Sequence, residues 1–79
     1  VQIMKDILEV IIRNLVNNQE EVSITERTEA KSINYEVKVA KDDMGKIIGK
    51  QGKMAKAIRS IMKAIAVKEH KKVNIEFLD

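Results

Sequence analysis

The sequence predicts an α+β fold, in which helices pack on one face of a three-stranded sheet and the elements follow in the order α-β-β-α-α-β. Two observations carry this prediction. Residues 32–39 alternate between polar and apolar side chains, which is the period of a half-buried strand. Segments on both sides instead repeat apolar residues every three or four positions, as amphipathic helices do. Because 79 residues leave room for one small core, we expect a single domain over residues 1–79.

The first half of the chain predicts a helix and a hairpin. The helix is expected over residues 3–16, followed by Asn17 and Asn18, which can end it through a left-handed turn. Residues 21–40 then alternate on both sides of a polar break, so they predict a β-hairpin. The predicted core-facing stripe of the helix is Ile3, Ile7, Val10, Ile11 and Leu15.

The second half predicts two helices and a third strand. Asp42 and Asp43 stand where an N-cap and first turn belong, and they predict a helix of about two turns that ends before Gly49. A longer helix is expected from Lys53, and residues 72–77 alternate as a final strand. The stripe of the longer helix that is expected to meet the core is Met54, Ile58, Ile61 and Ile65. A face with Met62, Ala55 and Ala66 is expected to remain available for self-association.

Positive charge is concentrated in one segment. Residues 44–72 contain nine basic residues and one acidic residue, whereas residues 1–43 have a net charge of −3. This asymmetry indicates a polyanionic partner, a nucleic acid or an acidic membrane surface. The membrane is disfavoured because the apolar stripe of the basic helix is needed by the core. The ridge expected to meet the polyanion consists of Lys53, Lys56, Ser60 and Lys63, with Arg59 beside it.

All three glycines of the chain fall within eight positions of this basic segment. The stretch from Gly49 to Gly52 predicts a tight turn between two helices, where the absence of side chains lets a phosphodiester approach the main chain. Lysines surround the turn. The spacing excludes a nucleotide P-loop, because Lys50 occupies the place of the second glycine. The spacing also excludes the dinucleotide-binding pattern G-x-G-x-x-G, because Ile47 occupies the place of its second glycine.

The stretch IIGKQGKMAKAI resembles the I-I-G-x-x-G-x-x-x-x-x-I signature of KH domains, and the order of elements resembles the type II arrangement of that fold over essentially the whole chain. In particular, the chain is similar to small free-standing bacterial KH proteins. The resemblance implies binding of single-stranded RNA in RNA regulation or RNA chaperoning, and association with itself and with a larger KH-containing protein. It implies no cofactor. The absence of cysteine suits a reducing cytoplasm, which is the expected location. The residues expected at the RNA site are Gly49, Lys50, Gln51 and Gly52 in the loop, Ile47 and Ile48 in an aliphatic groove, and Lys46, Lys53 and Lys56 around them.

Other chemistries find little support in the sequence. The chain has no cysteine and one histidine, His70, which is expected to be a helix C-terminal residue. We therefore expect neither a metal site nor an enzyme. Tyr35 and Phe77 are the only aromatic residues, too few for base-stacking platforms. The alternative function is a protein-protein adaptor whose basic helix meets an acidic partner.

Overall fold

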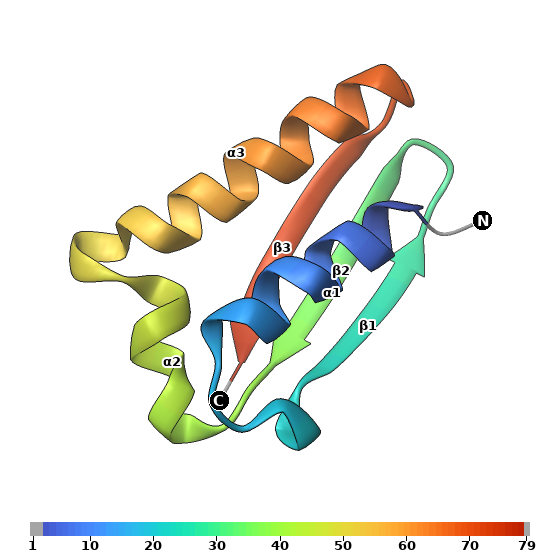
Figure 1. Cartoon of the computed structure of the whole chain (residues 1–79). Helices are drawn as coiled ribbons and strands as arrows, with labels where there is room; N and C mark the ends of the chain where they lie inside the picture. Colours follow the sequence, from blue (N-terminus) through green and yellow to red (C-terminus); the bar gives the residue numbers. More distant parts are fainter. Residues whose placement is uncertain (1–2, 79) are drawn as a thin grey trace.

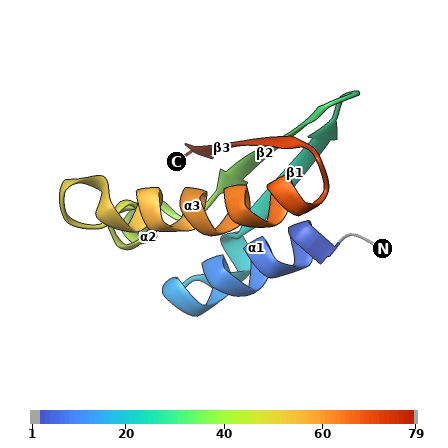
Figure 2. The same ribbon diagram turned by 90° about the horizontal axis from the view of Figure 1, so that it is seen from above.

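The computed structural model describes residues 3–78, and its elements follow the predicted order, which confirms the α+β class. All three α-helices lie on the same side of the sheet (Figures 1 and 2). The elements are α1 (Ile3–Leu15), η1 (Gln19–Glu21), β1 (Ser23–Thr28), β2 (Ser32–Lys38), α2 (Lys41–Ile48), η2 (Lys50–Gly52), α3 (Lys53–Lys68) and β3 (Lys72–Leu78), where η marks a 3-10 turn.

The sheet has the strand order β1-β2-β3. Strands β1 and β2 form the predicted antiparallel hairpin, in which Ile24 lies opposite Val37. Strand β3 pairs with β2 in parallel, with Ile75 opposite Tyr35. A parallel pair needs a crossover connection, which α2 and α3 provide. As a result β3 forms one edge of the sheet and runs beside α3 (Figure 1).

The core lies between the sheet and the helices. Strand β2 contributes Ile33, Tyr35 and Val37, which are buried at alternate positions as its period-two pattern predicts. Burying an aliphatic or aromatic side chain of this size contributes about 1.5–3 kcal/mol. The polar residues of β2 lie on the opposite face, where Asn74 donates a hydrogen bond of 2.9 Å to the side chain of Asn34.

The predicted stripe of α1 is only partly right: Ile7, Ile11 and Leu15 pack against the core, but the centre of the buried face lies part of a turn away. Its buried residues are Met4, Leu8 and Ile12, whereas Ile3 and Val10 are 58% and 60% exposed. Eight of the 13 residues of this helix are apolar, so the apolar arc is wider than the surface that the sheet and α3 can cover.

Helix α3 shows the same rotation, although Ile58 of the predicted stripe is buried and Ile65 packs against the core. Ala55, Met62 and Ala66 are buried together with Ile58, whereas Ile61 is 47% exposed. The small alanines let the helix backbone approach the core closely. The expectation that Met62, Ala55 and Ala66 form a self-association face is therefore wrong. Within residues 3–78, no helix combines the length and apolar character that crossing a bilayer requires.

The start of α2 also differs from the prediction. The N-cap residue is Ala40, which makes no side-chain cap, and Asp42 and Asp43 lie in the first turn. Asn17 and Asn18 are not left-handed, since the non-glycine residues with positive φ among residues 3–78 are Gln51 and His70. Instead, the residues after α1 are held by a tertiary contact with Asp43.

Candidate nucleic-acid interface

The bend between α2 and α3 requires its first glycine. Gly49 has φ 75° and ψ 178°, a conformation that L side chains rarely adopt. In addition, a Cβ on this residue would lie 2.7 Å from the Cβ of Met54 and 2.9 Å from the Met54 nitrogen. Gly49 thus allows α2 to approach the first turn of α3, and any side chain would push the two helices apart.

The middle of the bend faces solvent. Lys50 and Gln51 are both exposed, and Gln51 takes a left-handed conformation with φ 57° and ψ 27°. Gly52 closes the bend by donating its N–H to the carbonyl of Gly49 at 3.3 Å. It is also the N-cap of α3, and no side chain caps this end within the described residues. The positive end of the α3 dipole therefore meets an exposed bend that carries a lysine, which favours an anion there.

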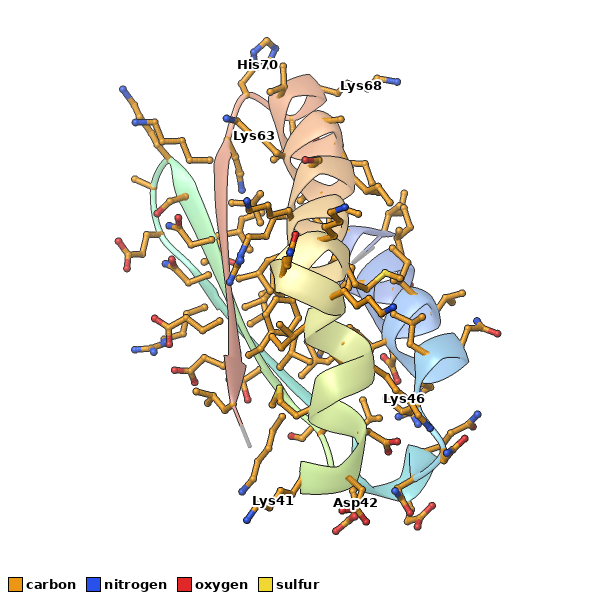
Figure 3. All side chains as sticks on the ribbon, turned by 90° about the vertical axis from the view of Figure 1, so that its left-hand side faces the viewer. Lys41, Asp42, Lys46, Lys63, Lys68 and His70 are labelled. Atoms are coloured by element: carbon orange, nitrogen blue, oxygen red, sulfur yellow. The ribbon has the colours of Figure 1, made fainter. Side chains whose placement is uncertain are left out.

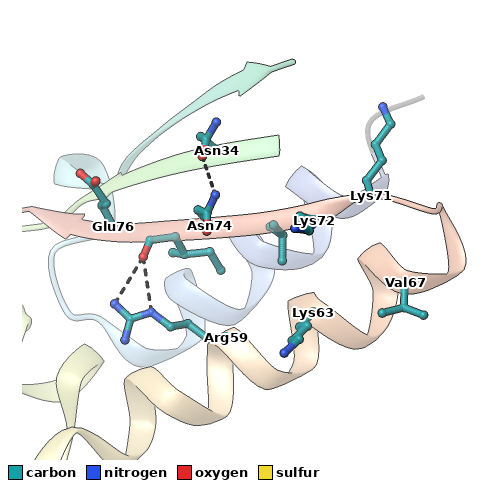
Figure 4. A pocket seen from close by; sticks show the side chains of 10 residues that line it. Asn34, Arg59, Lys63, Val67, Lys71, Lys72, Asn74 and Glu76 are labelled. Atoms are coloured by element: carbon teal, nitrogen blue, oxygen red, sulfur yellow. Dashed lines mark hydrogen bonds between the residues drawn. The ribbon is translucent and has the colours of Figure 1, made fainter. Parts of the chain in front are cut away.

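A groove of about 750 Å³ lies between α3 and the edge strand β3 (Figure 4). Its apolar part comes from Val67, Val73 and Ile75, and its charged rim is mainly basic. The charged residues of the lining are Arg59, Lys63, Lys71, Lys72 and Glu76. An aliphatic floor with a cationic rim suits a ligand that has flat apolar faces and a polyanionic backbone.

Arg59 reaches across this groove from α3 to β3. Its Nε and Nη2 atoms donate to the backbone carbonyl of Ile75 at 3.4 and 3.3 Å (Figure 4). The guanidinium carbon lies 5.2 Å from the ring centroid of Phe77, within cation-π range. These contacts fix the guanidinium plane over the free edge of β3.

The bend and the groove belong to one surface. Lys56, Arg59 and Lys63 follow one another at spacings of three and four along α3, so they share one side of the helix. At a rise of about 1.5 Å per residue, Lys63 lies roughly 16 Å along the axis from Gly52. That span is of the order needed by the four nucleotides that a KH site clamps.

The structure does not bring every predicted residue to this surface. Ile47 is 0% exposed and belongs to the core, so the expectation that it contacts bases is wrong. Its neighbour Ile48 is half-buried. Lys46 projects from α2 on the side away from β3, whereas Lys63 lies between α3 and β3 (Figure 3). Lys50, Gln51, Lys53 and Lys56 are exposed, as the prediction requires.

Asp43 anchors the first turn of α2. Its buried carboxylate accepts hydrogen bonds from the backbone N–H of Asn17 and of Asn18, at 3.1 and 2.9 Å, and from the Asn18 side chain at 3.0 Å. The Nζ atom of Lys46 lies 3.6 Å away. The hydrogen bonds, that of the Asn18 backbone first, lower the pKa of Asp43, although burial acts in the opposite direction. This carboxylate ties the end of α1 to the first turn of α2.

Sequence reasoning missed the strand side of the groove. The alternation predicts Val73 and Ile75 as core-facing, and the structure confirms that Ile75 is buried and that Val73 packs against the core, but their spacing does not say which strand they join. The available signal was the basic ridge of α3, together with the connection through two helices, which favours parallel pairing. No three histidine or acidic side chains among residues 3–78 gather where they could hold a metal ion.

The comparisons with known proteins agree on one family. The family model described as "KhpA/KhpB, KH domain" matches residues 5–77. The chain is 53% identical to the RNA-binding protein KhpA of Clostridium acetobutylicum, over 95% of this chain and 100% of that protein. It is 49% identical to the protein of the same name from Clostridium perfringens, with the same coverage. It is 47% identical to the RNA-binding protein KhpA of Chlamydia caviae, over 96% of this chain and 97% of that protein. No solved structure matches the chain significantly.

Proposed function

Because the chain belongs to the KhpA/KhpB family of KH domains, we propose that residues 1–79 form a single KH domain that binds single-stranded RNA without catalysing a reaction. The observations that carry this proposal are the exposed bend at Gly49–Gly52 and the mainly basic groove that begins further along α3, at Arg59. In this proposal the RNA backbone crosses the bend, and Lys50, Lys53 and Lys56 pair with phosphates.

The bases lie in the groove between α3 and β3. The exposed Val67 and the half-buried Val73 provide an aliphatic floor, and the partly buried Phe77 is covered by Arg59 rather than open for stacking. Recognition then depends on apolar contact with the base faces and on hydrogen bonds to the base edges. This mode explains how a chain with only two aromatic residues can hold bases.

A double substitution, Lys50→Asp with Gln51→Asp, tests the proposal. It places two negative charges on the exposed bend and keeps both glycines, so the affinity for an unstructured RNA of eight nucleotides should fall at least ten-fold. The matched control is Lys31→Asp with Ala30→Asp, which makes the same charge change on two adjacent exposed residues of the turn between β1 and β2. Equal loss in both variants, or no loss in a folded loop variant, would overturn the site.

We propose a second copy of the chain as a further partner, which would raise the affinity of a small site by avidity. The apolar flank of α1 favours this idea, since Ile3, Ile7, Val10 and Ile11 line a shallow depression of about 300 Å³ on the helical side. Sedimentation should then show a dimer that Val10→Glu dissociates. A monomer at all accessible concentrations would contradict the proposal.

The proposed protein partner and cellular role rest on membership of the family. A larger KH-containing protein is the proposed alternative occupant of the α1 flank, and RNA regulation or RNA chaperoning in the cytoplasm is the proposed role. The adaptor function is the competing proposal, since the basic ridge of α3 could also meet an acidic protein. The salt dependence described in the Discussion separates the two.

A further inference from the structure

Arg59, which lines the groove, has a hydrogen-bonding edge that no other described residue occupies. A guanidinium can donate in pairs, either side-on through Nε and Nη2 or end-on through Nη1 and Nη2. The side-on pair donates to the backbone carbonyl of Ile75. Within the described residues no hydrogen bond uses Nη1, so the end-on pair remains available. The Ile75 carbonyl and the Phe77 ring orient this pair.

The end-on pair matches some bases better than others. Guanine presents two adjacent acceptors, O6 and N7, and arginine bound to both is the commonest specific base contact in protein-DNA complexes. Cytosine presents N3 and O2 side by side. In adenine an amino donor lies between the N7 and N1 acceptors. In uracil an N–H lies between the two carbonyls. In single-stranded RNA both the Watson–Crick and the Hoogsteen edges are accessible.

The same contact weakens recognition of adenine. The free edge of β3 could have accepted a hydrogen bond from an amino group at the carbonyl of Ile75. Arg59 already donates two hydrogen bonds to that oxygen and lies over it. An adenine amino group would thus compete with the charged guanidinium for the same carbonyl oxygen. The charged donor forms the stronger hydrogen bond.

We propose that Arg59 makes the groove selective for a base with two adjacent acceptors, guanine or cytosine, over adenine and uracil. This inference rests on the proposed function and names the base chemistry of its site. A bidentate contact of this kind discriminates by about 1–3 kcal/mol, so the preference should be about five-fold or more.

The test measures the affinity of the whole chain for oligouridine of eight nucleotides in which one central position is uridine, adenosine, cytidine or guanosine. The guanosine and cytidine oligomers should bind about five-fold tighter or more, and Arg59→Lys should reduce this difference below about two-fold. Replacing guanosine by 7-deazaguanosine, which lacks N7, should remove its advantage, whereas inosine should keep it. These two analogues test whether guanine is read through its O6 and N7 atoms.

Two further variants make the result decisive. Arg59→Met keeps the aliphatic stem over Phe77, so it replaces the lysine variant should that one fail to fold. Lys63→Gln removes a neighbouring groove cation and should weaken all four oligomers by a similar factor. Loop-dependent binding without base preference, or a preference that survives both Arg59 variants, overturns the inference and leaves the proposed function standing. Binding that ignores the Lys50→Asp, Gln51→Asp change overturns both.

Discussion

Gly49 and Met54 approach each other so closely that a Cβ on residue 49 would lie 2.7 Å from the Cβ of Met54. This contact sets the angle between α2 and α3, and with it the position of the exposed bend relative to the groove. The glycine pattern of the sequence thus reflects two different needs. One is the packing of one helix end against another, and the other, in the proposed function, is access for the RNA backbone.

Gly49→Ala should destabilise the fold. The substitution adds a Cβ clash to a backbone conformation that alanine rarely adopts, so we expect a loss of about 2–4 kcal/mol in the free energy of unfolding. Urea denaturation followed by circular dichroism measures this loss. A change below about 0.5 kcal/mol would show that the bend can move aside.

Gly45→Ala is the matched control within the same helix. Gly45 lies inside α2 without a positive φ, and a Cβ there would meet nothing within 4 Å. Alanine should raise the free energy of unfolding by about 0.5–1 kcal/mol, because it restricts the unfolded chain and favours the helix. A destabilised Gly45→Ala variant would mean that α2 tolerates side chains less well than its surroundings indicate.

The strands and the bend could be predicted because their signals are local. Alternation within residues 32–39 decides which side chains face the core, and glycines at residues 49 and 52 decide where the helices break. The faces of α1 and α3 could not be predicted, since more than one row of each helix is apolar. Tertiary packing selected the row with Leu8 in α1 and the row with Ala66 in α3.

The groove and the Asp43 contact depend on residues that are far apart in the sequence. Asp43 satisfies N–H groups 25 and 26 residues away, and no local pattern marks such a partner. Ile75 lines the groove only because β3 pairs in parallel at the edge of the sheet. A spacing argument could place the lysines of α3 but not the strand opposite them.

Asp43 should make the stability of the fold depend on pH in the acidic range. Its pKa is lowered in the folded state, so its contribution is fully present above its unfolded pKa and is lost as the pH falls toward the folded value. Asp43→Asn should therefore lower the melting temperature at pH 7. The difference between the two proteins should shrink below about pH 4. A difference that stays constant down to about pH 2.5 would contradict this role.

Salt dependence separates the RNA proposal from the adaptor alternative. If about two to four lysine or arginine side chains pair with phosphates, the logarithm of the RNA association constant should fall with the logarithm of salt at a slope of about −1.4 to −2.8. The Lys50→Asp, Gln51→Asp variant should have a shallower slope, since it loses one phosphate contact. Equal slopes and affinities for wild type and variant would indicate generic polyelectrolyte binding and favour the adaptor.

The most direct test maps the amide resonances of the ¹⁵N-labelled chain during titration with an unstructured RNA of eight nucleotides. The proposed function predicts the largest shifts at Gly49–Gly52 and along the groove, at Arg59, Val73 and Ile75. Shifts confined to α1 or to the outer face of the sheet, with the bend unchanged, would contradict it.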